Sequence, residues 1–213
     1  NRGRNPMKKR VTLILMAIIL FPALLHPISA GIGFNAGSCN LSYTLNGEDE
    51  IFSLNGIGLS SMALIGGDLG LFFSSIMQIA PLIMSLSGES IDINEYGFLL
   101  IMSSTVGPGY RLWLSETASL LLGGGFALVY ASGSPKEYGS TLPEVLSMSW
   151  GAGIHGSYHM VLSPPVSFWT GIDCAFTFNG SEETLDNGYV SLPWAVSVTL
   201  SIGISTSLDN RLY

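Results

Sequence analysis

The chain has 213 residues, of which 47% are hydrophobic and only 11% are charged. Charged residues make up about a quarter of an ordinary soluble domain, so this composition argues against a soluble enzyme. The apolar content excludes intrinsic disorder, and two cysteines are too few for a disulfide-stabilised scaffold.

The first predicted element is a secretory signal peptide over residues 7–30. A basic stretch at 7–10 precedes an apolar run at 11–25, and the small residue Ala30 stands before a plausible cleavage site at Gly31. The run is short for a membrane-spanning helix, which needs roughly 20 apolar residues. An uncleaved membrane anchor is the alternative interpretation.

Residues 1–6 precede Met7, the first plausible initiator, and are interpreted as an upstream extension or a mis-called start. Cleavage after residue 30 removes five of the eight basic residues and none of the 15 acidic ones. Such an acidic chain repels the phosphates of nucleic acids. We therefore expect no nucleic-acid partner.

After residue 30 the chain alternates apolar and small residues with a period of two, which predicts β-strands. The alternation is clearest in the last segment, where Trp, Val, Leu and Ile share one face and Ser, Thr, Ala and Gly share the other. The first segment needs a bulge, because Phe34 and Leu41 have opposite parity. Eight segments alternate in this way: 31–45, 51–63, 68–79, 96–112, 119–131, 145–160, 166–178 and 194–205.

The connections between these segments alternate in length and charge. The first, third, fifth and seventh are mostly the longer ones, and they hold eleven of the 15 acidic residues, including Asp49, Glu89, Glu137 and Glu183. Outer-membrane barrels have short periplasmic turns and longer extracellular loops. Only a closed barrel satisfies every backbone group of a β-protein in lipid.

The pattern therefore predicts an all-β fold: an eight-stranded antiparallel up-and-down transmembrane β-barrel over residues 31–213, in a bacterial outer membrane. The acidic loops are expected at the cell surface and both termini in the periplasm. A secreted soluble β-sandwich is the alternative. A sandwich needs a charged exterior, whereas the second face here is mostly Gly and Ser.

The segment GPGYRLWLSE at 107–116, followed by SLLLGGGF at 119–126, resembles the glycine-rich hairpins of small eight-stranded outer-membrane barrels. That group includes the OmpX, OmpA membrane-domain and OmpW families. The resemblance implies the same architecture for residues 31–213. It also implies that the terminal aromatic residue, Tyr213, is the assembly signal recognised by the barrel-assembly machinery.

Three ionisable residues are expected close together inside the barrel. His155 and His159 fall on the inner face of the sixth segment and Asp173 on that of the seventh. A hairpin turn near 163–165 sets His155 opposite or diagonal to Asp173, within side-chain reach. The alternatives are a pH-sensitive constriction, half of a catalytic triad, or a polar pair that only satisfies itself.

Arg111 is the one basic residue predicted inside the barrel, where it pairs with Asp173 or Glu116 or acts on ion selectivity. In the outer half of the lumen an apolar lining is expected from Leu99, Ile101 and Val129.

We therefore expect a narrow, OmpW-like channel or chamber for small solutes, hydrophobic ones included. The alternative is a surface adhesin or structural protein that acts through its acidic loops. Neither an enzymatic activity, a cofactor nor a metal is expected. The expected partners are outer-membrane lipid, the barrel-assembly machinery, and a small solute or a host surface ligand.

Overall fold

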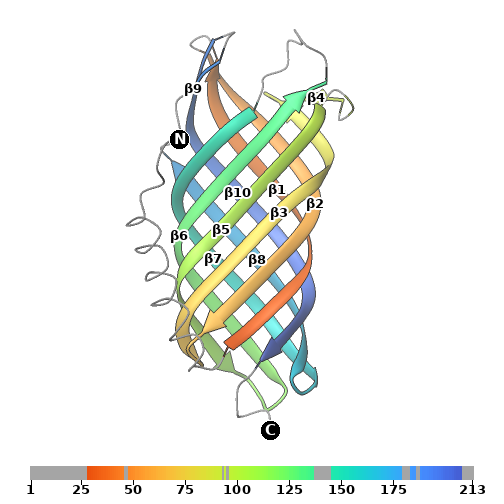
Figure 1. Cartoon of the computed structure of the whole chain (residues 1–213), viewed down its shortest axis with the longest axis vertical. Helices are drawn as coiled ribbons and strands as arrows, with labels where there is room; N and C mark the ends of the chain where they lie inside the picture. The colour runs from red at the N-terminus through yellow and green to blue at the C-terminus, as the bar shows by residue number, and fades with distance from the viewer. Residues whose placement is uncertain are drawn as a thin grey trace, which may run out of the picture.

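Eight long antiparallel strands and two short ones make up the fold of the computed structural model (Figure 1). The structure describes residues 28–45, 48–92, 94, 96–136, 145–178, 183–185 and 188–207. The strands are β1 (Ile28–Leu45), β2 (Glu48–Ile65), β3 (Leu69–Leu86), β4 (Glu89–Ile91), β5 (Tyr96–Trp113), β6 (Ala118–Pro135), β7 (Val145–Ser163), β8 (Val166–Phe178), β9 (Glu183–Leu185) and β10 (Gly188–Ser207).

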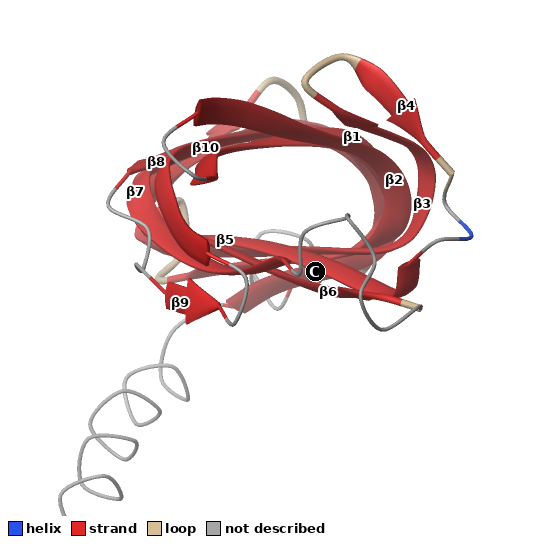
Figure 2. Ribbon diagram, turned by 90° about the horizontal axis from the view of Figure 1, so that it is seen from above, coloured by secondary structure: helices blue, strands red, loops and turns tan. Residues whose placement is uncertain are grey.

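The eight long strands close into a barrel. Each pairs with the next long strand along the chain, and β1 pairs with β10 from Ser29↔Ser207 to Leu45↔Val190. Figure 2 shows the closed ring from above. The short strands β4 and β9 extend the hairpins that follow β3 and β8. The predicted eight-stranded antiparallel barrel is confirmed.

The strands are staggered by ten residues around the ring, because the registered partners of Ala30 lead back to β1 at Asn40. Starting from Ala30, these partners are Ala63, Phe73, Val106, Phe126, Ala152, Phe176, Val196 and Asn40. Such a stagger in eight strands implies a tilt of about 40° and an interior that side chains just fill.

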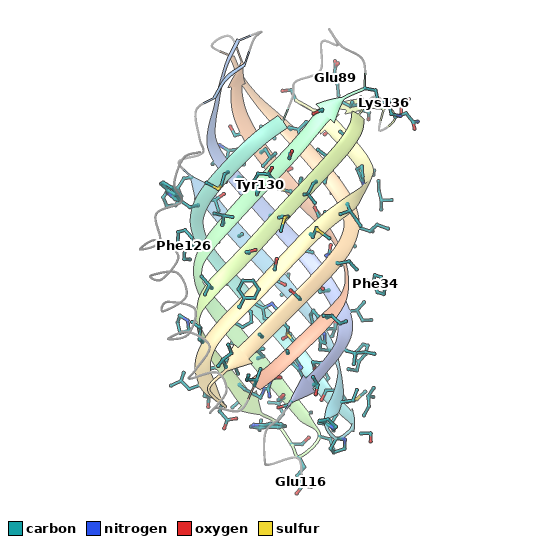
Figure 3. The ribbon with its side chains drawn as sticks, in the orientation of Figure 1. Phe34, Glu89, Glu116, Phe126, Tyr130 and Lys136 are labelled. Atoms are coloured by element: carbon teal, nitrogen blue, oxygen red, sulfur yellow. The ribbon has the colours of Figure 1, made fainter. Side chains whose placement is uncertain are left out.

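The outer wall is apolar over its whole circumference. Ile32 is 74% exposed and Phe34 70% exposed, and every long strand contributes exposed large hydrophobic side chains. Phe34 and Phe126 point away from the wall on opposite sides of the view in Figure 3. Exposed apolar surface on this scale is unfavourable in water, so it indicates a surface that faces lipid.

The connections divide between the two ends of the barrel. The turns at 66–68, 114–117 and 164–165 lie at one end, here called the turn end, together with the start of β1 and the end of β10. The hairpins that carry β4 and β9 lie at the other, here called the loop end. Glu89 and Lys136 stand at the loop end and Glu116 at the turn end (Figure 3).

Two details of the predicted strands are wrong. The expected bulge in the first strand is absent from the register between Ser29 and Ser42. Leu41 faces inward and is buried, because the lumen is apolar at that height. The segments at 80–95 and 179–188 are also not simple loops, since they contain the end of β3 and the short strands β4 and β9.

Several N- and C-terminal predictions concern residues that the structure does not describe. Residues 1–6, the signal peptide up to residue 27, and Tyr213 lie outside the described residues. The predicted cleavage site, Ala30 and Gly31, lies within β1, so cleavage there would remove the first three residues of that strand. In the described part of the chain, no helix is long and apolar enough to cross a membrane.

Small inner-face residues create the space for large ones in this narrow interior. The fully buried ring of Phe72 lies against Gly109 and Gly123. A Cβ at Gly123 would lie 2.4 Å from Cδ1 of Phe72, and a Cβ at Gly109 would lie 2.6 Å from Cβ of Phe72. Phe72 of β3 can therefore pack in the lumen only because Gly109 of β5 and Gly123 of β6 have no side chain.

We predict that Gly123→Ala lowers the free energy of unfolding by about 1–3 kcal/mol, because Phe72 has to leave its position. The measurement is denaturant unfolding of the barrel in lipid vesicles. Gly156→Ala on β7 is the matched control, since its Cβ would meet only Cδ2 of Leu122 at 3.7 Å. Equal stability of the two variants would contradict the packing argument.

Candidate functional site in the barrel lumen

The lumen is divided along its length into sections of different chemistry. The half nearer the loop end contains a continuous cluster of buried side chains, here called the apolar section, of which Leu99 is the most exposed at 7%. The apolar section consists of Cys39, Leu41, Phe52, Leu54, Met84, Leu99, Ile101, Ala127, Val129, Ala131, Ala175 and Ala195. Leu99, Ile101 and Val129, the residues expected to line the outer lumen, all lie in it.

Below the apolar section lies a belt of buried polar side chains that have no hydrogen-bond partner in the described part of the chain. These are Asn35, Ser60, Gln78, Thr199 and Ser201. Asn35 is registered with Ser201 on one side and with Gly58 on the other, and Gly58 is registered with Gln78. A buried polar group without a partner is destabilising by about 1–3 kcal/mol, so this belt is suited to polar contacts that the chain itself does not supply.

Nearer the turn end, five side chains are joined in one continuous series, here called the hydrogen-bond chain: Asp173, His155, Ser157, His159 and Ser205. Nδ1 of His155 is 2.8 Å from Oδ1 of Asp173, and its Nε2 is 2.9 Å from Oγ of Ser157. The same oxygen lies 2.9 Å from Nε2 of His159, whose Nδ1 is 3.1 Å from Oγ of Ser205.

Aromatic rings enclose the two histidines. The ring centroid of Phe72 is 4.8 Å from that of His155, and the Trp169 ring is stacked on His159 at 6.4 Å. Space for the indole comes from Gly31, where a Cβ would lie 2.9 Å from Nε1 of Trp169. His155, Ser157, His159 and Asp173 are each at most 7% exposed.

Arg111 of β5 lies beside the hydrogen-bond chain at the turn end. Its guanidinium donates to Oγ of Ser29 at 2.6 Å and to Oγ of Ser207 at 3.4 Å, and it lies 5.7 Å from the centre of the Trp113 ring. The sequence predicted Asp173 or Glu116 as the partner of Arg111, and neither is among these contacts. Asp173 bonds His155, and Glu116 is exposed in a turn.

The sequence predicted His155 opposite or diagonal to Asp173, and the structure registers these two residues directly. Trp169, Ser205 and the two serines that contact Arg111 were missed. Because alternate residues of a strand share a face, the inward Asp173 also predicts an inward Trp169 on the same strand.

The connectivity Asp173–His155–Ser157 is that of a Ser–His–Asp triad. Oγ of Ser157, however, is shared with His159 and lies 3.9 Å from Sδ of Met62, and the serine is 3% exposed. A nucleophile needs space beside its oxygen for a substrate carbonyl. The arrangement therefore favours an internal polar network over an active site.

No group of three or more His, Cys, Asp or Glu side chains in the described residues is placed to hold a metal ion. Cys39 is buried in the apolar section, Cys174 is half-buried on β8, and both are free thiols. The strand β10 lies between them.

Comparison with known proteins identifies solved structures of similar fold. No protein-family model matches the sequence, and no curated protein matches it significantly. Among solved structures, the chain is similar to the outer membrane protein AlkL in lipid bilayers, with a TM-score of 0.55, 11% identity, and coverage of 86% of this chain and 90% of AlkL. It is also similar to OprG from Pseudomonas aeruginosa, with a TM-score of 0.52, 11% identity, and coverage of 86% and 96%.

The chain has the fold of the small outer-membrane β-barrels. A further similar structure is Ail of Yersinia pestis in complex with the heparin analogue sucrose octasulfate, with a TM-score of 0.38, 16% identity, and coverage of 86% and 99%. The bacterial outer membrane is the location that accounts for a closed barrel with a continuous apolar wall.

We predict that Asp173→Ala lowers the free energy of unfolding by about 1–3 kcal/mol, because Nδ1 of His155 loses its buried partner. Asp173→Asn keeps an acceptor oxygen and should lower it by less. The measurement is denaturant unfolding in vesicles. Thr199→Val is the matched control, because Thr199 is registered with Asp173 but its hydroxyl is among the buried groups without a partner. A loss of stability in the control as large as in Asp173→Ala would show that the effect is not specific to the His155–Asp173 contact.

Proposed function

We propose that the protein is a narrow, OmpW-like channel or chamber that takes up small apolar solutes at the loop end. The observation that carries the proposal is the apolar section, a continuous lining of Leu, Ile, Val, Phe, Met and Ala directly beneath the loop end. Small-molecule sites in proteins are mostly apolar, with a few placed polar groups. The belt of Asn35, Gln78 and three hydroxyls below the apolar section supplies such groups.

The interior does not favour a water-filled ion pore. Eight strands enclose a space that side chains just fill, and the inward side chains of the apolar section are at most 7% exposed. Toward the turn end, the hydrogen-bond chain and the contacts of Arg111 occupy the lumen. We infer that apolar solutes enter by displacing flexible apolar side chains, whereas ions face both an apolar and a hydrogen-bonded barrier.

Two substitutions at one registered position test this proposal. Ile101 and Gln78 are neighbours on β5 and β3 and both face inward. Ile101→Gln places a polar amide in the apolar section and should slow entry of an apolar probe several-fold. Ile101→Leu keeps the lining apolar at the same position and should leave entry unchanged.

The measurement is the rate at which N-phenyl-1-naphthylamine becomes fluorescent in the membrane of cells that express each variant at equal folded amount. Planar-bilayer conductance of purified wild-type protein is the companion experiment, and we expect only a small or no ion current. Equal probe uptake by cells with and without the protein would overturn the proposal. A large steady current would instead indicate an ion channel.

A surface-binding role through the loops is the second candidate. It is supported by the acidic residues at the loop end, such as Glu89, which is exposed there (Figure 3). Because like charges repel, these loops favour a cationic or neutral partner over a sulfated glycan. We propose no enzymatic role. We also propose membrane lipid and the barrel-assembly machinery as partners, with Tyr213 as the assembly signal. Signal-peptide cleavage is proposed between Ala30 and Gly31, which would remove Ser29 and keep the contact of Arg111 with Ser207.

Both candidates require the loop end to face outward, and trypsin tests this orientation. Lys136 is exposed at the loop end, while Arg111 is buried in the lumen. Trypsin added to intact cells should cleave after Lys136, and Lys136→Gln should resist. Adding Glu116→Lys to that variant should create a site at the turn end that is cut only after the cells are opened. Cleavage at position 116 in intact cells would show the opposite orientation.

A further inference from the structure

The hydrogen-bond chain is a series of alternating acceptors and donors that ends on a carboxylate. We propose that Asp173, His155, Ser157, His159 and Ser205 form a one-proton relay, loaded from the turn end, in which one added proton reverses the direction of every hydrogen bond between His155 and Ser205. The readout proposed below is independent of solute uptake, so this inference and the proposed function fail separately.

The direction of each bond follows from the chemistry of the terminal acid. An ionised Asp173 only accepts, so Nδ1 of His155 carries the proton, and Nε2 of a neutral His155 is then an acceptor. Ser157 donates its hydroxyl proton to that nitrogen, in preference to the weakly accepting Sδ of Met62 at 3.9 Å. Its oxygen accepts from Nε2–H of His159, and Nδ1 of His159 accepts from Ser205.

The two histidines are therefore opposite tautomers in the neutral state. His155 is protonated on Nδ1 and His159 on Nε2. Ser157 has only one proton to donate, so it cannot donate to both imidazoles. The tautomer of one ring is set by that of the other through a single oxygen.

A proton from water at the turn end moves along this series by four transfers. Ser205 passes its hydroxyl proton to Nδ1 of His159 and regains one from hydronium, which leaves as water. Nε2 of His159 passes its proton to Oγ of Ser157, and Ser157 passes its own to Nε2 of His155. The products are an imidazolium at His155 and a His159 protonated on Nδ1. Every hydrogen bond is kept, and the three between His155 and Ser205 are reversed.

The charges around the series hold the added proton at the His155 end. Asp173 of β8 contacts His155 directly, whereas Arg111 of β5 lies at the Ser205 end of the series, where it donates to Ser29 and Ser207. The remaining neighbours that face these rings, Phe72 of β3, Trp169 of β8 and Met62 of β2, are uncharged. An imidazolium is therefore favoured beside the carboxylate and disfavoured beside the guanidinium.

The relay has one entrance. Ser205 lies two residues before the end of β10 at the turn end. Beyond Asp173 toward the loop end, the next inward residue on β8 is Ala175 of the apolar section, which offers no hydrogen bond. Thr199 of the belt is registered with Asp173, but its hydroxyl makes no hydrogen bond to the described residues. A proton loaded from the turn end therefore stops at the pair of His155 and Asp173 and changes the charge of the lumen by one unit.

Nitrogen-15 NMR of the histidine rings in lipid bilayers tests the relay, because the Nδ1 and Nε2 shifts report which nitrogen is protonated. At high pH we expect His155 protonated on Nδ1 and His159 on Nε2. As the pH falls, His155 should become doubly protonated, and His159 should change to the Nδ1 tautomer over the same pH interval. Identical tautomers at high pH, or a His159 that keeps its tautomer while His155 titrates, would overturn the proposal.

Substitution of Ser157, which bonds both histidines, distinguishes a relay from two histidines that titrate independently. In Ser157→Ala the tautomer of His159 should no longer change when His155 is protonated. Ser157→Thr retains the hydroxyl and should retain the coupled change, which also covers the case in which the alanine variant does not fold. Ser201→Ala is the control, since that inward hydroxyl belongs to no hydrogen bond of the series. Coupled change in Ser157→Ala would exclude the relay.

Discussion

The pairing of β1 with β10 is the constraint on which the rest of the structure depends. In lipid, a backbone N–H or C=O without a partner is destabilising by several kcal/mol, so a sheet with an open edge is not viable there. Closure after eight strands with a stagger of ten residues removes both edges. It also sets the width of the lumen, and every inward side chain has to fit the space that remains.

That width explains why small and large residues alternate on the inner face. The buried rings of Phe72 and Trp169 occupy space left by Gly109, Gly123 and Gly31. The same narrowness removes water from the polar residues. The members of the hydrogen-bond chain satisfy one another. Those in the belt around Asn35 and Gln78 have no partner in the described part of the chain.

The sections of the lumen have different physical roles. The apolar section can exchange its contacts with another apolar molecule at little net change in free energy, because no hydrogen bond has to break. The hydrogen-bond chain cannot be displaced so readily, since each buried polar group would lose its partner. Uptake of an apolar solute into the loop half, with a proton site in the turn half, is therefore consistent with a single closed barrel.

The sequence by itself determined the strands, the faces and one polar pair. Period-2 alternation marks the lipid face of β10 and β7 because a strand turns each successive side chain to the opposite side. The register of His155 with Asp173 could be predicted because a short hairpin joins their strands, so only local chain geometry is involved. The acidity of alternate connections likewise marked the loop end.

Only the tertiary structure determines which side chains are in contact across the lumen. Leu41 looked misplaced from its parity, and it faces inward because the section around it is apolar. His159 of β7 reaches Ser205 of β10 although β8 lies between these strands, and Arg111 of β5 reaches Ser207 of β10. Those contacts depend on the stagger and on closure, which relate residues far apart in the chain. No local pattern of residues carries that information.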